Sequence, residues 1–169
     1  MPLYITRGTL RRLTVEVKAL ERRLREQATI VRQAIESGGG THDNGMYDAA
    51  IHEQAVLAAK LERINNYLLD PSIIEDLRGP ANSVTVGKVV VLENIKTGAK
   101  SSYAFLGPAD VECGIQGAIS YLSPLAQQVL GKKLGDVVRI SVPNGEYEAE
   151  IAEILQYQAV QYRADGSEG

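Results

Sequence analysis

The chain has 169 residues, a net charge of −3 and 44% hydrophobic residues, which is ordinary for a globular protein of one or two domains. The net charge excludes a generic nucleic-acid binder, and 5% aromatic residues without tryptophan argue against a base-stacking surface. The single cysteine, Cys113, cannot form an internal disulfide and is expected to be a packing residue. With no membrane-length apolar run and no signal peptide in residues 1–8, we expect a cytoplasmic protein.

The first part of the chain has the apolar spacing of two long helices. From the predicted N-cap Thr6 to about Glu36, apolar residues recur every three or four positions, as in a heptad seam. A second such segment stops at Asp70-Pro71, because the residue before a proline is pushed out of helical geometry. The predicted seam residues are Leu10, Leu13, Val17, Leu20, Leu24, Val31 and Ile35, then Tyr47, Ile51, Leu57, Leu61, Ile64 and Leu68.

A polar segment, residues 37–45, joins the two helices and contains three successive glycines, which cannot stay helical cheaply. The pattern therefore predicts an antiparallel helical hairpin with this segment as its tip. Asp43 at the tip has two interpretations: a carboxylate that helps to bind Mg²⁺, or a cap on the second helix. His42 and His52 are likewise either weak metal candidates or ordinary surface residues.

Charge is divided unevenly between the two helices. Residues 7–32 carry eight basic and three acidic side chains, a net charge of +5, whereas residues 43–70 carry two basic and five acidic ones, a net charge of −3. Opposite signs favour pairing of the helices. The basic stripe is either a solvated face paired with those acids or a surface for nucleic-acid phosphates or an acidic partner. Its candidate contact residues are Arg11, Lys18, Arg22 and Arg25.

After Gly79 the pattern changes to β structure. Strands are predicted over 84–92, 101–106, 137–142 and 147–155, with turns at Thr97-Gly98 and Asn144-Gly145. A short helix is predicted from Ser123-Pro124 to Val129, closed by Gly131. The fold class is therefore α+β. An antiparallel coiled-coil hairpin spans residues 1–78, an antiparallel β domain with one short helix spans 79–158, and a flexible tail spans 159–169.

Two stretches resemble the bacterial Gre transcript-cleavage factors. One runs from Ile119 through Ser123-Pro124-Leu125-Ala126 and Gly131-Lys132-Lys133 to Glu146, and is similar to the family's "SPLA…LLGKK.GD" pattern. The other, Asp43–Ala50, is similar to the family's "ENAEYHAA" run at the start of the second hairpin helix. The order of parts also agrees, so the resemblance covers nearly the whole chain.

The resemblance implies a C-terminal domain like that of FKBP and a function at bacterial RNA polymerase. The C-terminal domain would dock at the rim of the secondary channel through Ser123, Pro124, Lys132 and Lys133. The hairpin tip, Gly39, Gly40, Thr41, His42, Asp43, Asn44 and Tyr47, would reach the active site and the nascent RNA 3′ end. There Asp43 would help to hold a polymerase-bound Mg²⁺ while the polymerase cleaves backtracked RNA. The isolated chain would be a monomer, bind no cofactor of its own and not be an enzyme.

The tip differs from the family pattern "GD..EN" at its acids. Gly40 occupies the position of the Asp, and Asp43 replaces the Glu. One carboxylate should hold Mg²⁺ more weakly than two, so a factor that occupies the channel without stimulating cleavage is the alternative. An FKBP-like isomerase or chaperone is a distant alternative, because the C-terminal half has only Phe105 and no tryptophan for an aromatic pocket. A coiled-coil adaptor without a role in transcription is a further one. Ser120 and Ser123 lack partners for a hydrolase triad.

Overall fold

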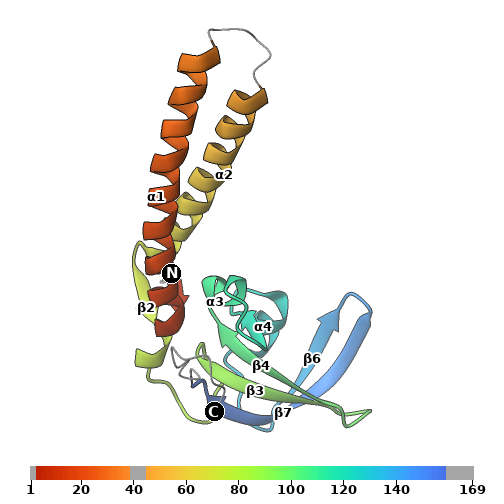
Figure 1. Ribbon diagram of the computed structural model, residues 1–169. Helices are drawn as coiled ribbons and strands as arrows, with labels where there is room; N and C mark the ends of the chain where they lie inside the picture. Colours follow the sequence, from red (N-terminus) through yellow and green to blue (C-terminus); the bar gives the residue numbers. More distant parts are fainter. Residues whose placement is uncertain (1–2, 39–44, 159–169) are drawn as a thin grey trace, which may run out of the picture. The chain divides into compact units, whose positions relative to one another are not determined.

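The chain forms two compact units. The computed structural model describes residues 3–38 and 45–158. The first unit contains the described residues 3–9 and 71–158, and the second is Leu10–Asp70. Figure 1 shows two long helices followed by a sheet with short helices, which confirms the predicted α+β class. The predicted tip residues 39–44 and the predicted tail 159–169 lie outside the described residues.

The two long helices lie side by side and run in opposite directions (Figure 1). Helix α1 spans Arg7–Gly38 and helix α2 spans Gly45–Leu68, close to the predicted limits. Thr6 is the N-cap of α1, as predicted, because its Oγ1 accepts a hydrogen bond from the Thr9 N–H at 3.3 Å. At about 1.5 Å per residue, α1 and α2 are roughly 48 and 36 Å long.

The seam between α1 and α2 keeps a seven-residue spacing. Its buried residues are Leu13, Leu20 and Ala34 on α1, and Ala50, Leu57 and Ile64 on α2. The prediction was wrong near the tip, where Ile35 and Ile51 are 58% and 38% exposed. At each of these places an alanine and an isoleucine both fit a spacing of three or four residues. The heptad register places the alanine, Ala34 or Ala50, in the seam.

The first unit is built on a five-stranded sheet with the strand order β5-β4-β3-β7-β6. These strands are β3 (Lys88–Asn94), β4 (Lys100–Leu106), β5 (Ala118–Ser120), β6 (Val137–Val142) and β7 (Gly145–Gln156). The predicted short helix is present as α4 (Pro124–Val129). Its Ala126 and Val129 pack with Phe105, Ile140 and Ile151 of the sheet in the main buried core.

The sheet is mixed and not wholly antiparallel as predicted. Strands β4 and β5 pair in parallel, and the chain between them forms a second short helix, α3 (Pro108–Glu112). A parallel neighbour needs such a crossover, whereas a tight turn joins antiparallel strands. The three-residue strand β5 has no alternating pattern long enough to predict it.

One predicted strand begins later than expected. Val84 is buried, but its N–H donates to the Lys132 carbonyl at 2.8 Å and its carbonyl accepts the Gly131 N–H at 2.9 Å. Gly87 then adopts a φ of +85°, a conformation that favours glycine, and β3 starts at Lys88. Strand β6 lies at the predicted residues.

Two further strands flank the hairpin in sequence and were not predicted. Strand β1 (Leu3–Ile5) pairs in parallel with β2 (Pro71–Ile73), and a 3-10 turn follows over Ile74–Asp76. Ile74 forms a second buried cluster with Ala104 and Leu106. The ends of the predicted hairpin segment, residues 3–9 and 71–78, therefore belong to the first unit.

Candidate functional site

The structure describes only the residues that flank the hairpin tip. Gly39, Gly40, Thr41, His42, Asp43 and Asn44 lie outside the described residues. Tyr47 lies in the first turn of α2 and is 36% exposed, and His52 is also exposed on α2. Near the same end of the hairpin, Ile35 and Met46 are exposed apolar residues. The roles of the tip residues, Asp43 above all, remain predictions.

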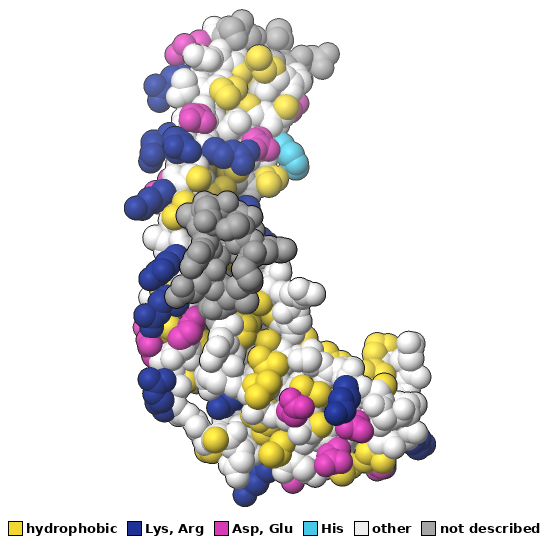
Figure 2. All heavy atoms as spheres, turned by 60° about the horizontal axis from the view of Figure 1, so that its bottom comes forward, with side chains coloured by type: hydrophobic (Ala, Val, Ile, Leu, Met, Phe, Trp, Pro, Cys, Tyr) yellow, Lys and Arg dark blue, Asp and Glu magenta, His cyan; other side chains and the backbone are white. Residues whose placement is uncertain are grey.

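The four basic candidates on α1 lie together on one exposed stripe. At 100° per residue, Arg11, Lys18, Arg22 and Arg25 fall within about 60° of the helix circumference, on the side away from the seam residues Leu13 and Leu20. All four are exposed, and none forms an ion pair within residues 3–38 and 45–158. Figure 2 shows Lys and Arg side chains along one edge of the helical part. We call these four residues the basic stripe.

Other basic residues of the hairpin are paired across the seam. Arg23 Nη2 lies 3.0 Å from Glu53 Oε1, and Lys60 of α2 forms an ion pair with Glu16 of α1. These pairs confirm that opposite charges join the two helices. No such pair joins the basic stripe to α2 within residues 3–38 and 45–158, and its role, as a solvated face or as a contact surface, stays a prediction.

The predicted docking residues occupy the two ends of α4. Ser123 is its N-cap and accepts the Ala126 N–H at 3.2 Å, and Pro124 is the exposed first residue of the helix. Lys132 and Lys133 are exposed just beyond its C-terminal end. Helix α4 itself has six residues and is roughly 9 Å long.

The turn before α4, Ser120–Pro124, is closely held, and we call it the docking corner. Ser120 Oγ accepts the Leu122 N–H at 3.1 Å, and the Ser120 carbonyl accepts the Ser123 N–H at 2.9 Å. The Gln127 side-chain amide donates to the Tyr121 carbonyl at 2.8 Å. Within the docking corner Tyr121 is buried, and Leu122 is 52% exposed beside the exposed Pro124.

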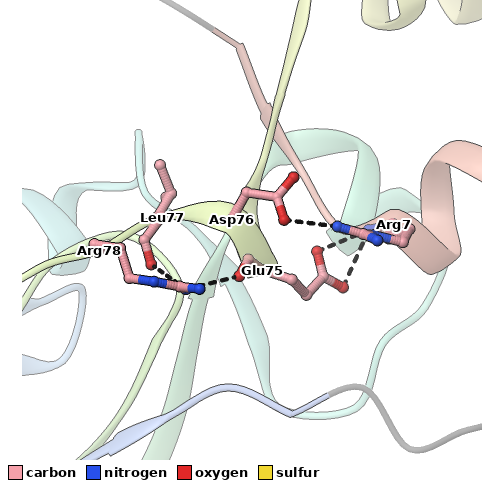
Figure 3. Close-up of polar contacts among 5 residues, drawn as sticks. All are labelled: Arg7, Glu75, Asp76, Leu77 and Arg78. Atoms are coloured by element: carbon pink, nitrogen blue, oxygen red, sulfur yellow. Dashed lines mark hydrogen bonds and ion pairs between the residues drawn. The ribbon is translucent and has the colours of Figure 1, made fainter.

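The start of α1 is held by three acidic residues that sequence reasoning did not identify. The Arg7 N–H donates to both carboxylate oxygens of Glu75 at 2.9 and 3.1 Å, and Arg7 Nη2 lies 2.7 Å from Asp76 Oδ1 (Figure 3). Asp110 of α3 is fully buried and accepts from the Thr6 hydroxyl at 2.6 Å and from the Gly107 N–H at 2.9 Å. Carboxylates at this end also suit the helix dipole. The only local sequence feature that points to this arrangement is the apolar run Leu3–Ile5 before Thr6.

Other kinds of site find no support in the part of the chain that the structure describes. There, no group of three or more His, Cys, Asp or Glu side chains could hold a metal ion. Phe105, the only phenylalanine, is fully buried in the core of the β unit. No helix among the described residues is both long and apolar enough to cross a bilayer.

Comparison with known proteins assigns these parts to a class. Residues 79–156 match the family described as "Transcription elongation factor, GreA/GreB, C-term". Transcription elongation factor GreA of Halalkalibacterium halodurans is 33% identical over 151 residues, which cover 89% of this chain and 95% of the relative. GreA of Bacillus cytotoxicus is 32% identical over 142 residues, covering 80% and 89%. The crystal structure of Thermus aquaticus Gfh1 shares 28% identity, covers 91% of this chain and 98% of that one, and gives a TM-score of 0.42.

A helical hairpin joined to a mixed β unit, with sequence relationships along nearly the whole chain, defines a transcription elongation factor. The chain belongs to the GreA/GreB family. The resemblance seen in the docking-corner and tip motifs is thereby confirmed.

Proposed function

We propose that the chain binds bacterial RNA polymerase, docks through its β unit at the rim of the secondary channel, and inserts its hairpin into that channel. Family membership carries this proposal, because the relatives that span the chain are transcription elongation factors. Two long paired helices suit a channel, and α1 alone is roughly 48 Å long. In this proposal the chain is a cytoplasmic, monomeric accessory factor, and the polymerase supplies the catalytic machinery.

The proposed target is a backtracked or arrested elongation complex, in which the factor stimulates RNA cleavage by the polymerase itself. Asp43 is proposed to contribute one carboxylate to Mg²⁺ in the polymerase active site, near the nascent RNA 3′ end. The basic stripe is proposed to face RNA phosphates or acidic polymerase groups, because its four cations have no ion-pair partner within the described residues. The docking corner, Lys132 and Lys133 are proposed to contact the channel rim.

The sequence of the tip favours a second candidate function. Gly40 stands where the family pattern has an acid, so the tip brings one carboxylate and not two. A factor with this tip would occupy the channel and inhibit or modulate transcription without cleavage. Both candidates require polymerase binding, and they differ only in what the tip does there.

A cleavage assay separates the two. A stalled complex with labelled, backtracked RNA is incubated with Mg²⁺ and the factor, and binding is measured in parallel. Shortened RNA supports the cleavage factor, whereas binding without shortened RNA supports the channel-occupying one. A wild-type chain that does not bind polymerase contradicts both.

Two tip variants sharpen this test. We expect Asp43→Asn to abolish any stimulated cleavage and Gly40→Asp to increase it several-fold, because they remove and restore one Mg²⁺ ligand. Polymerase affinity should stay within about twofold in both, a difference of about 0.4 kcal/mol. Asp48→Asn, which changes another exposed acid in the first turn of α2, is the matched control. Equal cleavage by Asp43→Asn and the wild type would leave Asp43 as a helix cap only.

A further inference from the structure

The N-terminal segment, residues 3–6, contacts the docking corner directly. The rings of Tyr4 and Tyr121 meet edge to face, with centroids 5.4 Å apart and an interplanar angle of 79°. Burial raises the pKa of the Tyr121 hydroxyl, and a hydrogen bond with the backbone of Tyr4 acts in the opposite direction. Tyr121 is 5% exposed, although it lies in a turn between two short elements, so Tyr4 supplies part of its enclosure.

A second link joins the same segment to the chain that leads into the corner. Asp110 accepts hydrogen bonds from the N–H of Thr6 at 3.1 and 3.2 Å and from its hydroxyl at 2.6 Å. At Gly107 an added Cβ would lie 1.8 Å from the Tyr4 carbonyl oxygen, so only glycine allows this approach. Helix α3, which carries Asp110, contacts both β1 and β5, and β5 runs directly into Tyr121.

These contacts make a remote segment part of the support of the docking corner. The family match begins at residue 79, so the docking unit defined by sequence omits residues 3–6. Without Tyr4 the Tyr121 ring loses its edge-to-face partner and becomes more exposed. A corner released in this way must be ordered again on binding, which costs affinity.

We propose that residues 3–6 support the docking surface. Tyr4 is a positioning residue that acts through Tyr121 on Leu122, Ser123 and Pro124. This inference rests on the proposed docking of the β unit to polymerase. It adds a requirement: the N-terminal segment sets the affinity of the chain for polymerase and leaves the action of the hairpin tip unchanged.

The test compares full-length variants for affinity and for effect at saturation. Tyr4→Ala should raise the dissociation constant for purified bacterial core RNA polymerase about tenfold, equivalent to about 1.4 kcal/mol. Its effect on transcription at saturating concentration should equal that of the wild type. Tyr4→Phe keeps the ring and the backbone bond and should bind normally. Val138→Ala, in the main core of the same unit, controls for lost stability. If Tyr4→Ala folds poorly, Tyr4→Leu replaces it in the same measurements, because leucine keeps an apolar side chain at this position without an aromatic ring.

Amide hydrogen exchange reports on the corner without polymerase. Tyr4→Ala should speed exchange of the Leu122 and Ser123 amides, and Val138→Ala should not. The inference is overturned if corner exchange is unchanged, or if Tyr4→Ala binds as the wild type does. It is also overturned if Val138→Ala at equal thermal stability weakens binding equally. Failure of the wild type to bind at all would instead refute the proposed function.

Discussion

Asp110 places a carboxylate in the interior of the β unit, where the Thr6 N–H, the Thr6 hydroxyl and the Gly107 N–H satisfy it. An asparagine there must turn its NH₂ group toward Thr6 or Gly107, so that two donors face each other. We expect Asp110→Asn to lower the free energy of unfolding by about 2–3 kcal/mol. Urea denaturation followed by tyrosine fluorescence measures this loss.

A neighbouring acid provides the matched control for this residue. Asp76 also holds the start of α1, through its ion pair with Arg7, but its side chain is 64% exposed. An exposed ion pair contributes little, so Asp76→Asn should cost less than about 1 kcal/mol. Equal losses in the two variants would show that burial of the Asp110 carboxylate does not matter to stability.

Among the elements, the hairpin depends on its seven-residue seam. Leu57 is 3% exposed in the centre of α2, whereas its neighbour Val56 is 50% exposed. Leu57→Ala leaves a cavity between the helices and should destabilise the hairpin by about 2–5 kcal/mol. Val56→Ala should change stability by no more than about 0.5 kcal/mol. Urea titrations monitored by far-ultraviolet circular dichroism compare the two, and similar losses would place the seam elsewhere.

The success of the sequence predictions follows the length of each element. Both long helices repeat their apolar pattern over many turns, and β6 and β7 have a strong Asn-Gly turn signal, so local residues determine them. Strands β1, β2 and β5 have three residues each and depend on distant partners. The Thr6–Asp110 bond that fixes β1 spans 104 positions, and no local pattern encodes it.

At the scale of the whole molecule, motifs located the docking corner, and helical spacing located the basic stripe. The contacts that hold the corner could not be predicted, because Tyr4 and Tyr121 are 117 positions apart in the sequence and meet only in the fold. The seam between the helices shows a smaller example of a contact that the sequence alone does not determine. Ile35 fits the apolar pattern as well as Ala34 does, and packing between the helices decided which one is buried.

The charge arrangement yields a prediction for the whole chain, which carries a net charge of −3 yet exposes the basic stripe on α1. We expect the double variant Arg22→Gln, Arg25→Gln to bind complexes containing backtracked RNA more weakly. Each lost phosphate contact should reduce the slope of log affinity against log salt by about 0.7. Binding to polymerase without nucleic acid should change less.

Arg23→Gln is the control for this double variant, since Arg23 lies between Arg22 and Arg25 but pairs with Glu53 across the seam. Fluorescence anisotropy over a range of salt concentrations measures all three chains. If the slope is unchanged in the double variant, the stripe does not contact nucleic acid. A fall in affinity for nucleic-acid-free polymerase would then assign the stripe to an acidic surface of the polymerase, and an unchanged affinity would assign it to solvent.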